Sequence, residues 1–362
     1  MAKVRLGDYV RIRTGKLDAN AADQNGKYPF FTCSIVPLCI NTYSYDCECV
    51  LVAGNGDLNV KYYNGKFDAY QRTYIVESLD NKLLSVPYLY RFMDKYIETL
   101  RNISIGGVIK YIKLGNLTEA SINLPTISKQ NEIVDVLSVV DNLIKGVEQQ
   151  LADLDILVKS RFVEMFGNPK DNPKRFKSIR IGELTDVLTG STPNRSNKDY
   201  YEGKIPWVKT GEIHPGHINS TEECISEVAL KETTCKLLPV DTVMIAMYGQ
   251  GKTRGQSGIL GIKAATNQAC AAILPCEKLN PVFLNQYLVI EYSRLRDMGR
   301  GAQQANLNLS MIKNYHILSI PIELQNQFAD FVAQVDKSKL AIQQSLDELE
   351  TLKKSLMQQY FG

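Results

Sequence analysis

The residues closest to a known chemical motif lie at 246–253, which read AMYGQGKT. This segment differs by one residue from the phosphate-binding loop G-x-x-x-x-G-K-[ST], in which backbone N–H groups and a lysine hold the phosphates of a nucleotide. Position 246 is alanine in place of the first glycine, and the matching segment of the first half, 53–57, has no Lys-Thr pair. A nucleotide-driven enzyme built on this loop is therefore the weaker of two hypotheses.

The same glycine-rich loop carries residue types that suit DNA. Glycine permits close approach of the backbone, lysine and arginine bind phosphate or guanine, and glutamine pairs with adenine. Lys252, Arg254 and Gln256 supply these groups, with Tyr248 beside them. The residues therefore favour a loop that contacts a DNA backbone and base edges.

Candidate DNA contacts, taken as polar and aromatic residues of expected loops, occur in both halves of the chain. In the first half they are Lys16, Asn55, Lys61, Tyr62, Tyr63, Lys66, Arg72 and Lys110. In the second half they are Asn194, Arg195, Lys209, Tyr248, Lys252, Arg254, Gln256, Asn267, Gln303, Gln304 and Asn306. The alternative for each is a solvated surface residue, or for Tyr62 and Tyr63 a partly buried strand residue.

Residues for catalysis or metal binding form no recognisable group in the sequence. An adenine-N6 methyltransferase would contain [DN]-P-P-[YF], whereas segments 168–170, 172–174 and 280–282 read NPK, NPK and NPV. The three histidines have neither triad nor metal-ligand spacing. The eight cysteines lack paired C-x2-C knuckles. We therefore expect reduced and mostly buried thiols, no metal and no catalytic residue in this chain.

The candidate contacts belong to a duplicated framework. Residues 130–167 align without a gap on residues 325–362, at a constant offset of 195. Shorter matches, such as 50–53 with 243–246, extend the duplication towards the start of each half, and the second half has a longer insertion at about 191–240. One framework with different loops suits two domains that perform the same task on different targets.

Each aligned segment has the apolar spacing of a long helix, because apolar residues recur in the a/d register of a coiled coil. The seam residues are Ile133, Leu137, Val140, Ile144, Val147, Leu151 and Leu154 in the first copy, and Phe328, Val332, Val335, Ile342, Leu346 and Leu349 in the second. Lys339 and Lys353 interrupt the second seam. A single helix with one apolar stripe must bury that stripe. We expect the two helices to pair as an antiparallel coiled coil with pseudo-two-fold symmetry; the alternative is that each helix packs on the domain before it.

The segments that precede the helices have a β-rich pattern. Short alternating apolar runs are separated by Gly, Asn and Asp, and short helices are expected at 86–100 and 281–296. The expected fold class is therefore α+β, with two β-rich domains that are each followed by a long helix. The expected boundaries are 1–128 for the first domain, 129–167 for the central helix, 168–178 for a linker, 179–322 for the second domain and 323–362 for the C-terminal helix.

Charge is divided unevenly between these parts. The helical segments 129–167 and 323–362 have net charges of −3 and −2, so the rest of the chain carries +8 although the whole carries only +3. A positive excess in the β-rich segments suits a polyanion such as DNA. No apolar run approaches the roughly 20 residues of a membrane span, and the N-terminus has no leader pattern, so we expect a cytoplasmic protein.

The order of these features resembles the specificity subunits of type I restriction–modification systems. The resemblance rests on Leu-Gly-Asp and Thr-Gly near the start, and on Leu-Pro at 124–125, Lys-Ser at 159–160 and Phe-Gly at 166–167, with their repeats. Thr126 and Ile322 depart from a second proline that is frequent in that family. The resemblance implies two target-recognition domains that each bind one half of a bipartite DNA sequence, on helices that set the spacer between the halves.

The resemblance also implies partners. Two modification subunits flank such a chain and methylate adenine at N6 with S-adenosylmethionine, a cofactor that the chain itself does not hold. Restriction subunits that translocate DNA can join them, and double-stranded DNA is the expected ligand. The alternative from another class is a scaffold whose paired helices join proteins without recognising DNA.

Overall fold

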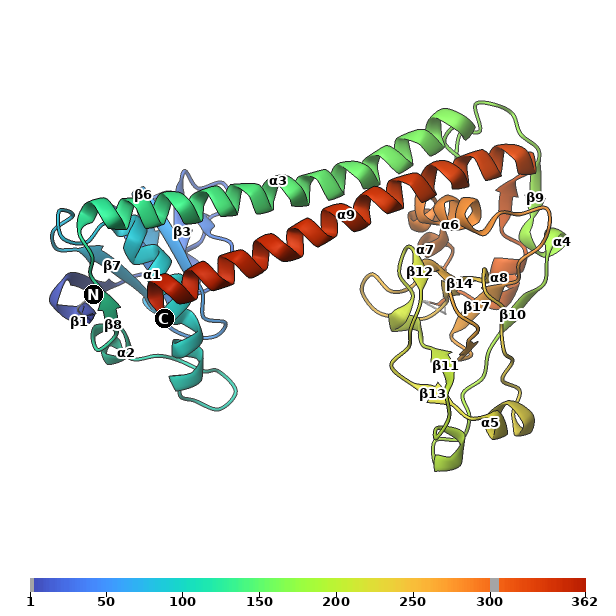
Figure 1. Ribbon diagram of the computed structural model, residues 1–362, viewed down its shortest axis with the longest axis horizontal. Helices are drawn as coiled ribbons and strands as arrows, with labels where there is room; N and C mark the ends of the chain where they lie inside the picture. The colour runs from blue at the N-terminus through green and yellow to red at the C-terminus, as the bar shows by residue number, and fades with distance from the viewer. Residues whose placement is uncertain (1–2, 300–305) are drawn as a thin grey trace. The chain divides into compact units, whose positions relative to one another are not determined.

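The computed structural model describes residues 3–299 and 306–362, which form two compact units. Unit 1 comprises Met1–Gln149 and Gln344–Gly362, and unit 2 comprises Gln150–Gln343. The two long helices are α3 (Ile127–Phe166) and α9 (Ile322–Phe361), and each contributes one part to each unit (Figure 1).

Unit 1 contains a six-stranded sheet with helix α1 (Val86–Ile103) packed on one face. The strand order is β2 (Val10–Thr14), β7 (Thr73–Ser78), β5 (Tyr45–Ala53), β6 (Val60–Ala69), β3 (Tyr28–Phe31) and β4 (Leu38–Ile40). The β3–β6 pair is parallel and the other neighbouring pairs are antiparallel. Unit 1 also has a two-stranded sheet of β1 (Lys3–Arg5) and β8 (Ser121–Asn123), helix α2 (Leu114–Thr118), and the 3-10 turns Leu6–Asp8 and Ala19–Ala21.

The central strand β5 is buried on both of its faces. Val50 and Val52 belong to the core cluster that includes Leu89 of α1, whereas Cys49 and Leu51 belong to a cluster on the opposite face. This follows from strand geometry, because successive side chains point to opposite sides of a sheet. The helix-side core is the larger of the two and includes residues of α3 and α9.

Unit 2 repeats this plan with additional short elements. Its five-stranded sheet has the order β10 (Val187–Thr189), β17 (Cys270–Ile273), β14 (Val243–Ala246), β15 (Ser257–Leu260) and β12 (His217–Ile218). The smaller sheets are β13 (Cys224–Ile225), β11 (Ile205–Val208) and β16 (Ala265–Thr266), and β18 (His316–Leu318) with β9 (Ser178–Arg180). The helices are α4 (Ile181–Leu184), α5 (Glu227–Glu232), α6 (Pro281–Ile290), α7 (Tyr292–Met298) and α8 (Leu309–Lys313), with 3-10 turns at Lys198–Tyr200 and Thr210–Glu212.

The strand order shows that the duplication includes the sheets. The order β2-β7-β5-β6 of unit 1 corresponds to β10-β17-β14-β15 of unit 2. The helix expected at 86–100 is confirmed, whereas the one expected at 281–296 is divided into α6 and α7. Glu291 lies at the break, where its buried carboxylate accepts hydrogen bonds from the hydroxyl of Tyr315 (2.8 Å) and from Arg294 (2.9 Å).

The long helices lie side by side and antiparallel within each unit (Figure 1). In unit 1, Asp141 of α3 pairs with Lys353 of α9 (2.7 Å), and Phe361 near the end of α9 packs on Tyr88 of α1. In unit 2, Phe162 near the end of α3 packs on Phe328 near the start of α9. The expectation that the two helices pair is confirmed, and the alternative in which each packs only on the preceding domain is wrong.

A buried glutamine anchors the start of each long helix. Gln130 is fully buried, and its amide Nε2 donates to the carbonyls of Leu83 (2.7 Å) and Pro125 (2.9 Å). Its Oε1 accepts from the backbone N–H of Ser85 (2.9 Å), the N-cap residue of α1. One side chain thus satisfies three backbone groups and fixes α3 to α1.

Gln325 makes the equivalent contacts in unit 2. Its Nε2 donates to Ile320 (2.8 Å) and Lys278 (3.2 Å), and its Oε1 accepts from the backbone N–H of Asn280 (2.9 Å), the N-cap residue of α6. The identity of the two glutamines in the sequence repeat therefore has a structural cause.

The cysteines are all free, but the expectation that most are buried is wrong. Cys49, Cys235 and Cys270 are buried, four others are half-buried, and Cys39 is exposed. Burial raises the pKa of Cys270 to about 12, so its thiol is protonated at neutral pH. Among the described residues, no helix combines the length and hydrophobicity that crossing a membrane requires.

Replacing Gln130 by methionine, which has a similar size and no amide, leaves the N–H of Ser85 and two carbonyls without their partner. We expect a loss of about 2 to 4 kcal/mol in the free energy of unfolding, measured by urea titration with circular dichroism. Gln150→Met, at an exposed position of the same helix, is the matched control. Equal stability of the two variants would contradict the anchoring role.

Candidate nucleic-acid interface

The ends of β2 and β5 and the start of β7 meet at one edge of the unit 1 sheet. Gly54 N donates to Arg72 O (2.8 Å), and Gly15 N donates to Thr73 O (3.1 Å). The segment after α1 joins them, because Ile112 N donates to Gly54 O (2.9 Å). We define the loop edge of unit 1 as residues 14–16, 54–56, 71–72 and 110–112.

Four of the sequence candidates lie on this edge. Lys16, Arg72 and Lys110 are exposed, and Asn55 is half-buried. The backbone brings them together, since Gly56 N donates to Lys110 O (2.9 Å). Three cations beside an amide give this edge a positive surface with hydrogen-bonding groups, which is what a nucleic-acid backbone and base edges require.

The other four candidates of the first half lie on β6, and the side chain of each contacts another residue of unit 1. The hydroxyl of Tyr62 donates to Glu48 (2.7 Å), and burial together with this bond raises the pKa of Tyr62 to about 12. The ring of Tyr63 packs on Phe31, with centroids 5.0 Å apart.

The two lysines of β6 also have partners within the unit. Burial lowers the pKa of Lys61, whose ammonium donates to the side chain of Asn59. The ammonium of Lys66 lies over the ring of Tyr43, 4.7 Å from its centroid. These four β6 residues therefore have structural contacts that the loop-edge candidates lack.

Unit 2 has an equivalent loop edge. Met247 N donates to Ala269 O (2.8 Å) and Leu307 N donates to Met247 O (3.0 Å), as Gly54 N and Ile112 N do in unit 1. We define the loop edge of unit 2 as residues 189–191, 247–256, 267–269 and 306–307. Of the candidates, it contains Tyr248, Lys252, Arg254, Gln256, Asn267 and Asn306.

The glycine-rich segment of this edge is a hairpin loop. It joins β14 to the antiparallel strand β15, whereas a phosphate-binding loop leads from a strand into a helix. Gly249, Gly251 and Gly255 have φ angles of +145°, +59° and +86°, which let the loop reverse direction. The hydroxyl of Tyr292 on α7 donates to the carbonyl of Lys252 (2.6 Å) and holds the loop against that helix. The nucleotide-binding alternative has no geometric support.

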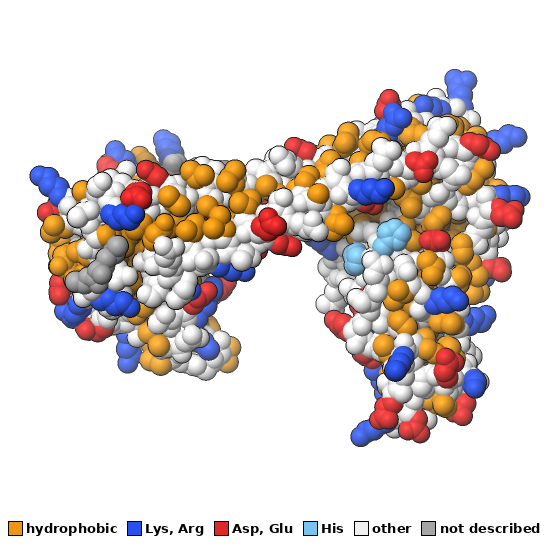
Figure 2. Space-filling view, in the orientation of Figure 1, with side chains coloured by type: hydrophobic (Ala, Val, Ile, Leu, Met, Phe, Trp, Pro, Cys, Tyr) orange, Lys and Arg blue, Asp and Glu red, His pale blue; other side chains and the backbone are white. Residues whose placement is uncertain are grey.

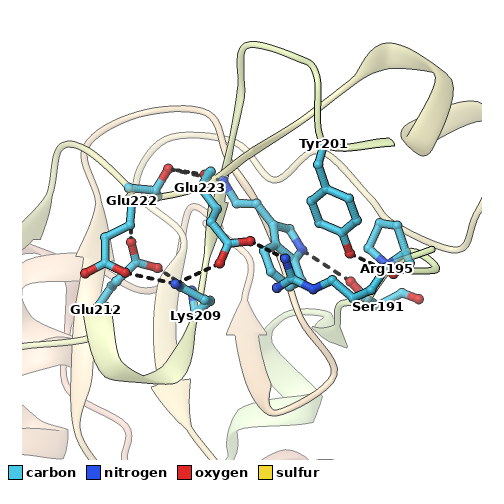
Figure 3. Close-up of polar contacts among 10 residues, drawn as sticks. Ser191, Arg195, Tyr201, Lys209, Glu212, Glu222 and Glu223 are labelled. Carbon is cyan, nitrogen blue, oxygen red and sulfur yellow. Dashed lines mark hydrogen bonds and ion pairs between the residues drawn. The ribbon is translucent and has the colours of Figure 1, made fainter. Parts of the chain in front are cut away.

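Arg195 and Lys209, two further candidates, are bound by carboxylates (Figure 3). Arg195 pairs with Glu223 (2.6 Å), and its guanidinium lies over the rings of Tyr201 (4.5 Å) and Trp207 (5.1 Å). Lys209 pairs with Glu223 (3.0 Å) and with a second carboxylate, that of Glu222 (2.9 Å).

Further hydrogen bonds join this cluster to neighbouring segments of the second-half insertion, between residues 191 and 223. Glu212 accepts from the backbone N–H groups of Lys209 (2.6 Å) and Glu222 (2.7 Å), and the indole of Trp207 donates to Ser191 O (3.2 Å). Hydrogen bonds from Arg195 and Lys209 hold the pKa of Glu223 below its usual value. Because these carboxylates neutralise Arg195 and Lys209, the cluster has little positive potential. The sequence identified the two cations but not the carboxylates that pair with them.

The remaining second-half candidates differ in placement. Asn194 is exposed and accepts from Ser196 N (3.0 Å) in a local turn. The side chain of Asn267 is also engaged, since it accepts from Ala269 N (2.9 Å). Asn306 is exposed, and Gln303 and Gln304 lie outside the described residues.

The predicted seam residues of the paired helices are all buried or half-buried. Ile133, Leu137, Val140, Phe328, Val335 and Leu346 are buried, and Ile144, Val147, Leu151, Leu154, Val332, Ile342 and Leu349 are half-buried. The lysines that interrupt the second seam meet carboxylates, because Lys339 pairs with Asp155 and Lys353 pairs with Asp141. Arg91 of α1 also pairs with Asp141, and although burial opposes it, these cations hold the pKa of Asp141 below its usual value.

Sequence reasoning missed one pair of loop-edge residues, Gln71 and Gln268. Gln71 precedes Arg72, whose carbonyl accepts from Gly54 N, and Gln268 precedes Ala269, whose carbonyl accepts from Met247 N. Both glutamines are exposed. They differ by 197 positions, whereas the helical repeat differs by 195, so a constant offset does not align them. A separate alignment of the segments around β7 and β17 would have found them.

The family model described as type I restriction modification DNA specificity domain matches residues 1–154 and 173–351. The chain is similar to the specificity subunit of the type I restriction enzyme EcoDI of Escherichia coli, with 42% identity over 187 residues that cover 52% of this chain and 37% of that protein. It is also similar to the MjaIX specificity subunit of Methanocaldococcus jannaschii, with 24% identity over 287 residues that cover 74% of this chain and 66% of that protein.

The chain thus matches from about a third to two thirds of the length of these two relatives. Among solved structures, it is similar to the S subunit of a type I restriction–modification system from M. genitalium, with a TM-score of 0.61 and 16% identity. That comparison covers 100% of this chain and 96% of the solved one. At this identity, the likeness establishes a common fold.

Glu223→Gln removes the charge that holds Arg195 and Lys209. Because the pKa of the native carboxylate is depressed, its contribution to stability is present above the usual pKa of about 4.3 and disappears as the pH falls through the lower native value. We expect a loss of about 1 kcal/mol or less at pH 7, since the pair is partly exposed, and a progressively smaller loss as the pH falls below the usual pKa. Thermal unfolding over a series of decreasing pH values measures this, and a loss that does not diminish towards acid pH would contradict the ion-pair explanation.

Proposed function

The chain belongs to the family of type I restriction modification DNA specificity domains, and from this premise we propose that it is the DNA-recognition subunit of a type I restriction–modification complex. Each unit binds one half of a bipartite target, and the paired helices set the spacer. Because the chain matches only part of some relatives, its target and its partners belong to this proposal.

The observation that carries the proposal is the repeated loop edge. The same backbone hydrogen bonds form it in both units, but its side chains differ, with Asn55, Arg72 and Lys110 in unit 1 and Tyr248 and Lys252 in unit 2. A constant frame with variable polar side chains suits recognition of two different half-sites. A single scaffold function would not need this variation.

We propose the residue ranges 1–128 and 179–322 as the two target-recognition domains, and 129–167 and 323–362 as the spacer helices joined through the linker 168–178. The exposed loop-edge residues are the proposed contacts to bases and phosphates. Arg195 and Lys209 contribute less, because carboxylates already neutralise them.

We propose that the chain is non-catalytic and works in the cytoplasm with two modification subunits. Those partners bind S-adenosylmethionine and transfer its methyl group to adenine N6, and restriction subunits join the complex where they are present. The role of this chain is to bind both half-sites at a fixed separation, so that the target adenine of each half-site lies at a modification subunit.

Exposed apolar residues on the long helices support docking of a protein partner. Val136, Val139 and Leu143 of α3 are 36%, 59% and 51% exposed and recur at helical spacing. Figure 2 shows hydrophobic side chains along the visible face of this part of the helix. In unit 2, Ile156 and Leu340 are also exposed. Such residues are unfavourable in water and favour a covered surface.

Co-expression of the chain with its modification subunit, followed by mapping of N6-methyladenine in host DNA, tests the proposal. We expect one asymmetric bipartite motif with a fixed spacer. In the variant Gln71→Ala/Arg72→Ala, one half-site becomes relaxed or unmethylated, because two exposed loop-edge groups of unit 1 are lost. Lys66→Ala, at an exposed lysine of β6, is the matched control and retains the motif.

A stable complex that methylates no bipartite motif would contradict the proposal and favour the protein scaffold. In that case duplex DNA of any sequence would bind with equal affinity. This outcome separates the two hypotheses because both predict assembly through the helices.

A second experiment lengthens the paired helices. Since α3 and α9 pair in both units, one heptad inserted at 144–151 needs a matching heptad in α9 at 342–349. Seven helical residues add about 10 Å. We expect a longer spacer or loss of the bipartite motif, with each half-site preference unchanged, as measured by methylation mapping. A change in the half-sites themselves would contradict the division of labour between helices and loops.

A further inference from the structure

The loop between α1 and α2 carries apolar side chains that are exposed to solvent. Val108 is fully exposed, Ile109 is 62% exposed, and Ile103 and Ile105 at the base of the loop are 42% and 43% exposed. The loop extends beyond both helices (Figure 1). A single exposed apolar residue is ordinary, but four within seven positions mark a surface that something covers.

The frame of this loop is well defined, which argues against a loose connection. Ile105 and Tyr111 exchange two backbone hydrogen bonds, of 3.0 and 2.8 Å. Gly106 has a φ of +119°, and a Cβ there would lie 2.5 Å from the carbonyl oxygen of Ile109, so the turn requires glycine. Val108 and Ile109 are therefore presented by a closed turn.

The loop is continuous with the loop edge of unit 1. Asn55 forms a β-bridge with Tyr111, and Gly56 N donates to Lys110 O (2.9 Å). Arg72 and Lys110, two candidates of that edge, are both cations and both exposed. An apolar tip flanked by cations suits a groove between phosphates better than an acidic protein surface.

We propose that Val108 and Ile109 contact the methyl group of thymine in the major groove and thereby determine part of the half-site of unit 1. This inference rests on the proposed DNA-recognition function and adds the chemistry of one contact. A valine or isoleucine side chain can neither donate nor accept a hydrogen bond. Among the groups that base pairs present in the major groove, the thymine methyl is the apolar one that such side chains recognise.

The duplication supplies an internal comparison. At the offset of 195, the positions of Val108 and Ile109 correspond in sequence to Gln303 and Gln304, a residue type that pairs with adenine. The two halves of the sequence thus carry apolar residues and amides, respectively, at this point of the repeat. Two domains that bind different half-sites require such a difference.

The test uses the assembled complex of the chain with its modification subunit and a duplex that carries the mapped methylation motif. Because the methylated base is adenine, each half-site contains thymine on one strand. Each thymine of both half-sites is replaced in turn by deoxyuridine, which lacks the methyl group, and affinity is measured by fluorescence anisotropy. We expect substitution in one half-site to weaken binding about fourfold, the equivalent of one buried methyl group.

The variant Val108→Ser/Ile109→Ser should bind the thymine duplex as weakly as the deoxyuridine duplex and show no difference between them. Val228→Ser, at an exposed valine of α5 in unit 2, is the matched control and should keep the full difference. Thermal unfolding of the complex should not change, since Val108 makes no contact that folding needs.

Three results would overturn the inference. If the unaltered complex binds every deoxyuridine duplex as tightly as the thymine duplex, the tip does not recognise a methyl group. This holds even if the serine variant loses affinity, because an apolar tip that wedges between base steps would give that result. A serine variant that keeps its sensitivity to deoxyuridine assigns the contact to other residues. A serine variant that no longer binds the modification subunit makes the tip a protein contact. Failure of the proposed function is different, because then no duplex shows sequence preference.

Discussion

The arrangement of this protein depends on two buried glutamine amides. Gln130 and Gln325 each bind three backbone groups where a long helix begins, and one of these groups is the N–H of the residue that caps α1 or α6. A buried amide is stable only when its donors and acceptor are all paired, so the geometry of the junction tolerates little change. The start of each long helix is thereby fixed to α1 or α6, the helix that packs on the sheet of the same unit.

From these junctions the helices pair along a seam that is not symmetric in its polar contacts. Asp141 and its repeat counterpart Asp336 are both aspartate, but Lys353 corresponds to Val158. The Asp141–Lys353 pair therefore occurs in unit 1 without an equivalent in unit 2, where Lys339 pairs with Asp155 instead. Ion pairs at seam positions specify register, since a shifted helix would leave each charge partly buried and unpaired.

The loop edges vary on this fixed frame, and their environment decides what each charged side chain can do. Arg72, in the first half of the chain, and Arg195, in the second half, are both arginines. Arg72 is exposed at the loop edge, whereas Arg195 pairs with Glu223 and stacks on Tyr201 and Trp207. A cation already bound to carboxylate gains little from phosphate, so the positive charge available for a polyanion is smaller than composition indicates.

The sequence alone determined the duplication, the fold class and the pairing of the helices, because these depend on periodic apolar residues and on identities that survive in both copies. It also identified Arg72, Lys110 and Lys252 as candidates by residue type. Only the tertiary structure decided which candidates share a surface, because hydrogen bonds such as Gly54–Arg72 and Met247–Ala269 join segments that are distant in the chain. It also decided which cations are neutralised and that Val108 and Ile109 are exposed on a closed turn, since burial and charge pairing depend on neighbours that no local pattern specifies.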